Sequence, residues 1–288
     1  MLQDFAEPLQ PFRPMKAFAP FPPVFCALLL AAGLPVFVAA QGGKAGVQEF
    51  DPRAFPGQMV DDVIVPVPSE VFTVLDKLGS PNWHQEVRKE KPPKTGDRTR
   101  LSLLFGVTVA EGFVAVQAED KEAVKDIGRD VIDLATALGL IKSVRPHAQA
   151  ILDAADKGDW ASIRKEFDKT QKTVRDSMEQ MKDADLSQCV SLGGWLRGTA
   201  SVTSVVTKNF SADSAELLNQ PMLVEHFIAR IERMGRERRE HDAVSDIAKG
   251  LKVILERMEG AVDGFTRDAV RDIGKVCESL LTEIRSVK

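Results

Sequence analysis

The spacing of apolar residues is the feature that most limits how this chain can fold. From residue 69 to residue 287, apolar side chains recur at intervals of three and four, without the alternation typical of a β-strand. A stripe at this spacing buries one side of a helix and leaves the other side in water. We therefore predict an all-α fold, either an antiparallel multi-helix bundle or stacked helical hairpins, with about eight or nine helices.

Capping residues and glycines mark the ends of the predicted helices. Asp120 is placed to cap one helix, which Gly139 ends, while Gly158 ends a second helix and Asp159 caps a third. Asp213 has a Glu three residues later, which is the spacing of a capping box, just before the segment LLNQPMLVEHFIARI. Breaks this short favour neighbouring helices that run in opposite directions.

Three similar heptapeptides, AVKDIGR, AVSDIAK and AVRDIGK, begin at Ala123, Ala243 and Ala269. In each, Ala, Val and Ile cluster on one side of a helix, and an Asp lies three residues before an Arg or Lys on the other side. The unequal intervals between them do not fit a solenoid. We interpret them as one amphipathic design reached three times, with duplication of a helical hairpin as the alternative. The expected surface ion pairs are Asp126–Arg129, Asp246–Lys249 and Asp272–Lys275.

The N-terminus predicts export. An uncharged apolar stretch, ALLLAAGLPVFVA, follows basic residues and leads into the small-residue junction VAAQGG. Residues 1–40 therefore read as a signal peptide, with Gln41 as the mature start, and Met15 offers an alternative, cleaner beginning. The expected location is the periplasm or the cell exterior. The alternative is an uncleaved anchor, although the stretch is shorter than the roughly 20 residues of a spanning helix.

The mature chain has two parts of different composition, residues 41–68 and residues 69–288. Residues 41–68 are rich in Gly and Pro without helical period and predict a flexible or extended lead-in. Residues 69–288 are expected to form a single all-helical domain. Within them, KEKPPKTGD at residues 89–97 cannot be helical, because adjacent prolines remove backbone donors.

The overall charge limits the partners. A net charge of −4 argues against a general nucleic-acid binder, which needs a basic surface to displace phosphate counterions. No motif names a protein or small-molecule partner. Membrane contact is expected only if the N-terminal stretch stays uncleaved, and the oligomeric state is open.

Glu111 is the first candidate for a ligand-binding residue. It lies within RLSLLFGVTVAEGFVAVQAED, the most apolar segment after residue 40, which predicts a central helix surrounded by others. A carboxylate near the middle of this segment argues against a second membrane span. A buried Glu must pair, become protonated or face a cavity, so Glu111 is a candidate for a ligand contact or an internal salt bridge.

The segment VSLGGWLRGTASVTSVV at residues 190–206 holds the other two candidates. Its three glycines lower helix propensity and predict either close helix packing or a groove. A groove beside Trp195 and Arg197 could receive an anionic or planar ligand. Arg197 could instead be the partner that Glu111 needs, which would give both residues a structural role.

Known catalytic and metal-binding motifs are missing from the sequence. No His follows a Glu by three residues, and HExxH, CxxC and CxxCH are absent, so we expect no metal and no cofactor. Haem bound by a His with Met178 or Met181 stays open as a minor alternative. The sequence has no GxSxG and no phosphate loop, but one sequence does not exclude a triad assembled in space.

Cysteines leave two alternatives. Cys26 would leave with the signal peptide, and Cys189 and Cys277 would remain in a compartment where disulfides persist. They can form one disulfide, or they are two separate buried thiols.

These features favour an exported, soluble helical protein that acts as a non-catalytic binding or scaffold module. The second hypothesis is an enzyme with a site inside the bundle around Glu111 and Arg197, together with His147 or His226. The third is a membrane-tethered helical protein of the cell envelope.

Overall fold

The computed structural model describes residues 58–60, 63–65, 68–180 and 183–286, all of which belong to one compact unit that runs from Phe50 to Lys288. Eleven α-helices and one short 3-10 helix provide most of the regular structure of these residues. Two of the eleven, α7 and α9, have only 5 and 4 residues, which leaves nine longer ones. The prediction of an all-α fold with about eight or nine helices is confirmed.

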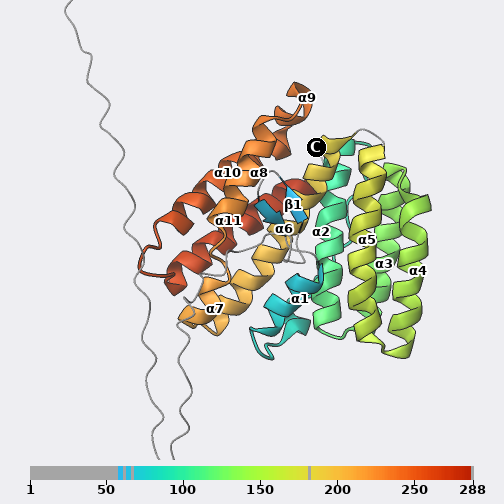
Figure 1. Cartoon of the computed structure of the whole chain (residues 1–288), viewed down its shortest axis with the longest axis horizontal. Helices are drawn as coiled ribbons and strands as arrows, with labels where there is room; N and C mark the ends of the chain where they lie inside the picture. Colours follow the sequence, from blue (N-terminus) through green and yellow to red (C-terminus); the bar gives the residue numbers. More distant parts are fainter. Residues whose placement is uncertain (1–57, 61–62, 66–67, 181–182, 287–288) are drawn as a thin grey trace, which may run out of the picture. The chain divides into compact units, whose positions relative to one another are not determined.

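The helices follow one another with short connections (Figure 1). Their bounds are α1 (Pro68–Asp76), η2 (Trp83–Gln85), α2 (Arg98–Gln117), α3 (Lys121–Leu138), α4 (Ile141–Lys157), α5 (Trp160–Gln180), α6 (Ala184–Lys208), α7 (Ala212–Glu216), α8 (Pro221–Glu232), α9 (Arg236–Arg239), α10 (Asp242–Glu259) and α11 (Arg267–Arg285).

Two short strands precede the helices. β1 (Gln58–Val60) pairs antiparallel with β2 (Val63–Val65), and Met59 lies opposite Ile64. Both strands fall within the predicted lead-in, which is therefore extended in this part. Residues 41–57 and the predicted signal peptide, 1–40, lie outside the described residues.

The centre of the fold is the pair α2 and α6, which lie side by side. On one side of this pair, α3 packs against α2 and α4 against α3, while α5 packs against α4 and returns to contact α1, α2 and α6; on the other side, α11 packs against α6, followed by α10 and α8 (Figure 1). Contact of α2 with both α3 and α6 explains why sixteen of its 20 residues are buried. The prediction of a central helix surrounded by others is confirmed.

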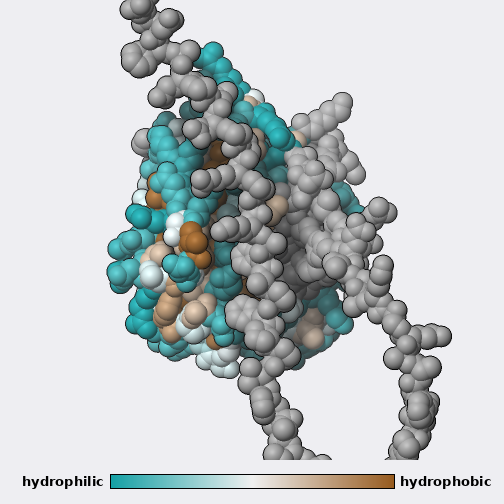
Figure 2. Space-filling view, turned by 60° about the vertical axis from the view of Figure 1, so that its left-hand side comes forward, coloured by the Kyte–Doolittle hydropathy of each residue, from teal (hydrophilic) through white to brown (hydrophobic). Residues whose placement is uncertain are grey.

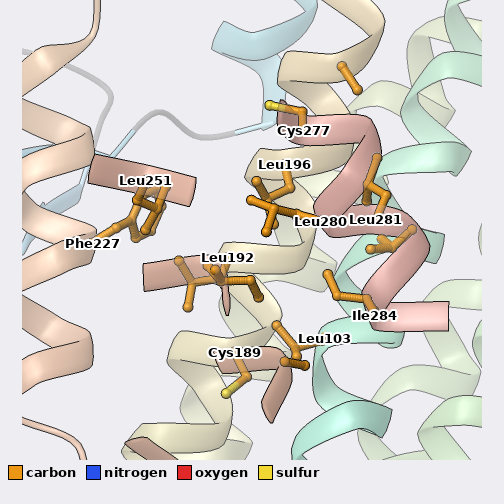
Figure 3. Close-up of a cluster of buried hydrophobic side chains, with 14 of the residues drawn as sticks. Leu103, Cys189, Leu192, Leu196, Phe227, Leu251, Cys277, Leu280, Leu281 and Ile284 are labelled. Carbon is orange, nitrogen blue, oxygen red and sulfur yellow. The ribbon is translucent and has the colours of Figure 1, made fainter. Parts of the chain in front are cut away.

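The main apolar core joins helices from both ends of the sequence. Leu103 of α2, Leu192 and Leu196 of α6, and Leu281 and Ile284 of α11 meet in it (Figure 3). A smaller cluster contains Phe72 of α1 and Phe167 of α5, whose rings lie 6.1 Å apart edge to face. Burial of these apolar side chains is the main favourable contribution to folding.

The face of the bundle shown in Figure 2 is mainly polar. On the face shown in Figure 2, hydrophilic residues predominate, and hydrophobic ones form small separate areas among them. Among the described residues, the large hydrophobic side chains most open to water are Met222, Val253 and Val262.

Most predicted helix ends are confirmed. The Asp120 side chain accepts a hydrogen bond from Ala123 N at 3.0 Å and caps α3. Gly139 and Gly158 end α3 and α4 in the left-handed conformation, with φ of 80° and 68°. A residue without a Cβ adopts these angles with little strain.

The capping box expected at Asp213 is wrong. Ser211 is the N-cap residue, and its Oγ accepts a hydrogen bond from Ser214 N at 3.1 Å. The helix so capped is the short α7, within which Asp213 lies in the first turn. The longer helix begins afresh at Pro221, where the missing N–H of proline costs nothing.

The three similar heptapeptides form the predicted surface pairs. Lys249 donates to Asp246 at 2.7 Å and Lys275 to Asp272 at 3.1 Å, and Arg129 pairs with Asp126 in the same way. The Val and Ile of each heptapeptide are buried. The repeated pattern thus serves three amphipathic helices, α3, α10 and α11.

Candidate functional site: a buried ion network between α2 and α6

Glycines bring the backbones of α2 and α6 into direct contact. A Cβ added at Gly193 would overlap the carbonyl of Leu103, and one added at Gly106 would overlap the carbonyl of Val190. The close-packing interpretation of the glycines therefore holds for Gly193. Only glycine permits the two backbones to approach this closely at these positions.

Glu111 of α2 and Arg197 of α6 face each other in this interface. Arg197 Nε donates to Glu111 Oε2 at 2.5 Å, and the two side chains are only 1% and 8% exposed. The structure therefore brings these two predicted residues together, in the internal salt bridge that the sequence left as an alternative. A charged pair this deeply buried needs further hydrogen bonds to offset the loss of water.

Those further hydrogen bonds involve the backbone of the segment just before α2 and one side chain of α6. The backbone N–H of Arg88 donates to Glu111 Oε1 at 2.5 Å, and Arg197 Nη2 donates to the carbonyl of Glu86 at 2.6 Å. Arg197 Nη1 donates to Ser201 Oγ, one turn along α6. Both oxygens of Glu111 and all three nitrogens of Arg197 thus have a partner within the chain.

We call residues 86–97, the extended segment between η2 and α2, the strap. Its first residue, Glu86, accepts hydrogen bonds from Lys208 Nζ at 2.5 Å and Ser204 Oγ at 3.2 Å, both from α6. Farther along, Arg285 of α11 donates to the carbonyls of Glu90 and Lys91 at 3.0 and 2.8 Å. Side chains from α6 and α11 therefore hold the strap against the bundle.

The end of the strap joins α2 to α10. Asp97 caps α2 by accepting from Thr99 N at 2.8 Å and Arg100 N at 3.1 Å. Its second oxygen lies 2.5 Å from Nε2 of His241, at the start of α10. Burial raises the pKa of Asp97, but the hydrogen bonds from His241 and the two backbone N–H groups outweigh it, so the pKa lies below its usual value.

Trp195 does not join this network. Its Nε1 donates to Gln220 Oε1 at 3.2 Å, and its ring lies 5.6 Å from that of Phe227 in α8. Residues two apart on a helix point to nearly opposite sides. The structure therefore directs the indole of Trp195 and the guanidinium of Arg197 to different partners on nearly opposite sides of α6.

The two cysteines are separate free thiols. Cys189 in α6 and Cys277 in α11 are fully buried and unbridged (Figure 3). Burial in apolar surroundings raises the pKa of each thiol to about 12. Of the two alternatives, the structure has the separate buried thiols, so Cys189 and Cys277 form no disulfide.

The histidines considered for a catalytic site are held elsewhere. His147 of α4 contacts Glu166 and Thr173 of α5, and His226 is buried in α8 beside Phe227. Met178 and Met181 fall outside the described side chains. Among the side chains that the structure describes, no three His, Cys, Asp or Glu come together as metal ligands would.

Helix α2 is long and apolar enough to cross a membrane. However, 89% of the apolar stretch of this helix is buried inside the fold, as expected for a core helix.

Comparisons with protein-family models, with curated proteins and with solved structures found no match to this chain.

Proposed function

We propose that the protein is an exported helical module that binds or scaffolds a partner, and that Glu111 and Arg197 serve its fold and carry out no catalysis. The observation that supports this structural role is that the hydrogen bonds of both side chains are all made within the chain. Every side-chain oxygen of Glu111 and every nitrogen of Arg197 has a partner within the chain. A substrate would have to displace these partners before it could use either charge.

Support for export comes from the sequence alone. The apolar stretch and small-residue junction before Gln41 have the composition of a cleaved signal. We propose the periplasm or the cell exterior as the place where the module works. The membrane-tethered alternative differs only in keeping residues 1–40.

A double-mutant cycle on the free energy of unfolding tests the structural role. Glu111→Gln and Arg197→Met should each cost about 3–5 kcal/mol, because each leaves a buried partner without its counter-charge. The double variant Glu111→Gln/Arg197→Met should cost less than the sum of the two single variants. Urea unfolding followed by circular dichroism measures all three.

The exposed pair Asp246–Lys249 is the matched control, since breaking a surface pair costs about 0–1 kcal/mol. An unchanged free energy in Glu111→Gln would remove the structural role. Saturable binding of acetate or phosphate in calorimetry, lost in Arg197→Lys, would favour the hypothesis of an enzyme or ligand site at this pair.

A further inference from the structure

A second polar cluster lies between α4 and α5, formed by His147, Glu166 and Thr173. The Nδ1 atom of His147 is 2.7 Å from Glu166 Oε1, and its Nε2 atom is 2.9 Å from Thr173 Oγ1. The residues are 19 and 26 positions from His147, so no local sequence motif connects them. A hydroxyl, an imidazole and a carboxylate thus stand in one hydrogen-bonded row.

The carboxylate sets the tautomer of the neutral ring. Burial raises the pKa of Glu166, but hydrogen bonds from His147 and Lys169 outweigh it, so the pKa lies below its usual value and the group is ionised at neutral pH. Its other oxygen accepts from Lys169 Nζ at 2.9 Å. An ionised carboxylate only accepts, so in neutral His147 the proton lies on Nδ1 and the Nε2 lone pair faces Thr173.

The hydroxyl of Thr173 is directed at that lone pair. Its neighbours on α5 behave differently: Thr170 donates to the carbonyl of Glu166 at 2.7 Å, and Ser177 donates to the carbonyl of Thr173 at 2.8 Å. Bonding to the carbonyl four residues earlier is a common arrangement for a hydroxyl on a helix. Thr173 instead has the imidazole as its acceptor.

The cluster is partly open to solvent. The side chains of His147 and Glu166 are 17% and 14% exposed, and Thr173 is only partly buried. The cluster therefore lies at the edge of the α4–α5 pair and is not sealed inside its core. In enzymes with unrelated folds, a hydroxyl nucleophile is activated by a hydrogen bond to a base, and a third group orients that base.

We propose that Thr173 is a reactive hydroxyl that accepts an acyl group from an activated ester, with His147 as its base and Glu166 as the residue that positions the ring. The oxygen of Thr173 forms a bond to the acyl carbon while the bond from that carbon to the leaving alcohol breaks. The hydroxyl proton passes to His147 Nε2 and then to the leaving oxygen. This covalent attachment site adds to the proposed scaffold function and does not depend on it.

The probe is p-nitrophenyl acetate, added to the full exported chain. We expect one acetyl group on Thr173, located by peptide mass spectrometry, together with release of p-nitrophenolate. Alkaline hydroxylamine removes the O-acetyl ester of a threonine and leaves the amide of an acetylated lysine intact, which separates the two labels. Thr173→Val should lose the label and Thr173→Ser should keep it.

Variants of the other two residues test their roles. His147→Gln should slow labelling of Thr173 by about 100-fold or more, the usual contribution of a positioned base. Glu166→Gln should slow it less, and should shift the nitrogen NMR signals of His147 away from the Nδ1–H tautomer. Circular dichroism at the assay temperature establishes that each variant is folded.

Ser177→Ala and His84→Gln are the matched controls. Ser177 is a hydroxyl on the same helix that donates to the main chain, and His84 is 62% exposed and 3.5 Å from Asp120. Neither change should alter the labelling rate. Labelling confined to lysines, or equal Thr173 labelling in folded His147→Gln and the wild type, would overturn the proposal.

Discussion

At the scale of single residues, Arg197 shows what a buried charge requires. Its nitrogens find their acceptors in Glu111, Glu86 and Ser201, and two of these lie 86 and 111 positions away in the sequence. A carboxylate in an apolar segment predicts that Glu111 needs a partner, and Arg197 was one of the candidates. The carbonyl of Glu86 and the N–H of Arg88 left no signal, because any residue carries these backbone groups.

The pKa of Asp97 leads to a prediction on acid stability. Because its pKa is lowered in the folded state, Asp97 stabilises the fold above its unfolded pKa of about 3.9, and this contribution is lost as the pH falls through the folded value. Asp97→Asn, which retains a good N-cap residue, should therefore be less stable than the wild type at pH 7.

The difference should shrink as the pH falls below about 4, where the unfolded chain takes up the proton first, and vanish below the lowered pKa of folded Asp97, where the carboxyl is neutral in both states. Urea unfolding between pH 2.5 and pH 7 measures it, and Asp97→Ser provides a second neutral cap for comparison. An equal difference at both ends of this range would contradict the assignment.

At the scale of helices, local sequence determined most boundaries. Asp120, Gly139, Gly158 and Asp159 act as predicted, because a cap or a left-handed glycine needs only its nearest neighbours. The prediction that Asp213 caps a helix was wrong because two neighbouring residues could serve as the cap. Ser211 and Asp213 are both good cap residues, and only the path of the chain decides which one stands at the start of the helix.

The glycines of α6 give a matched pair of stability predictions. Gly193→Ala should destabilise the fold by about 1–3 kcal/mol, because the added methyl group meets the backbone of α2. Gly198→Ala should stabilise it by up to about 1 kcal/mol, since a Cβ there meets nothing within 4 Å and alanine favours a helix. Thermal and urea unfolding of both variants measure the difference, and the same sign in both would contradict the packing.

At the scale of the whole molecule, the order of packing departs from simple hairpins. Leu103 of α2 lies beside Gly193 of α6, and Glu111, farther along α2, lies beside Arg197, farther along α6. The two helices therefore run in the same direction. Three helices, α3 to α5, lie between them in the sequence and allow this. The strap then ties the start of α2 to α6 and α11 through side chains. Periodicity describes each helix by itself and does not say which one lies beside which.

The proposed export predicts where the mature protein begins. The mature protein should begin at Gln41, because a signal peptidase cleaves after small residues such as those of VAA. Intact-mass measurement of the protein from the periplasm or the medium gives its N-terminus. A chain that keeps residues 1–40 and sediments with membranes would support the tethered alternative.

Local sequence patterns are sufficient to predict the fold class, most helix ends and the three surface ion pairs, because these depend on residues within about one helical turn of each other. The packing of the helices was needed to establish that Glu111 meets Arg197, that Trp195 points away from both, and that Cys189 and Cys277 are unbridged. It also assembled His147, Glu166 and Thr173. Contacts between distant helices depend on how whole faces pack, and no local pattern in the sequence records that.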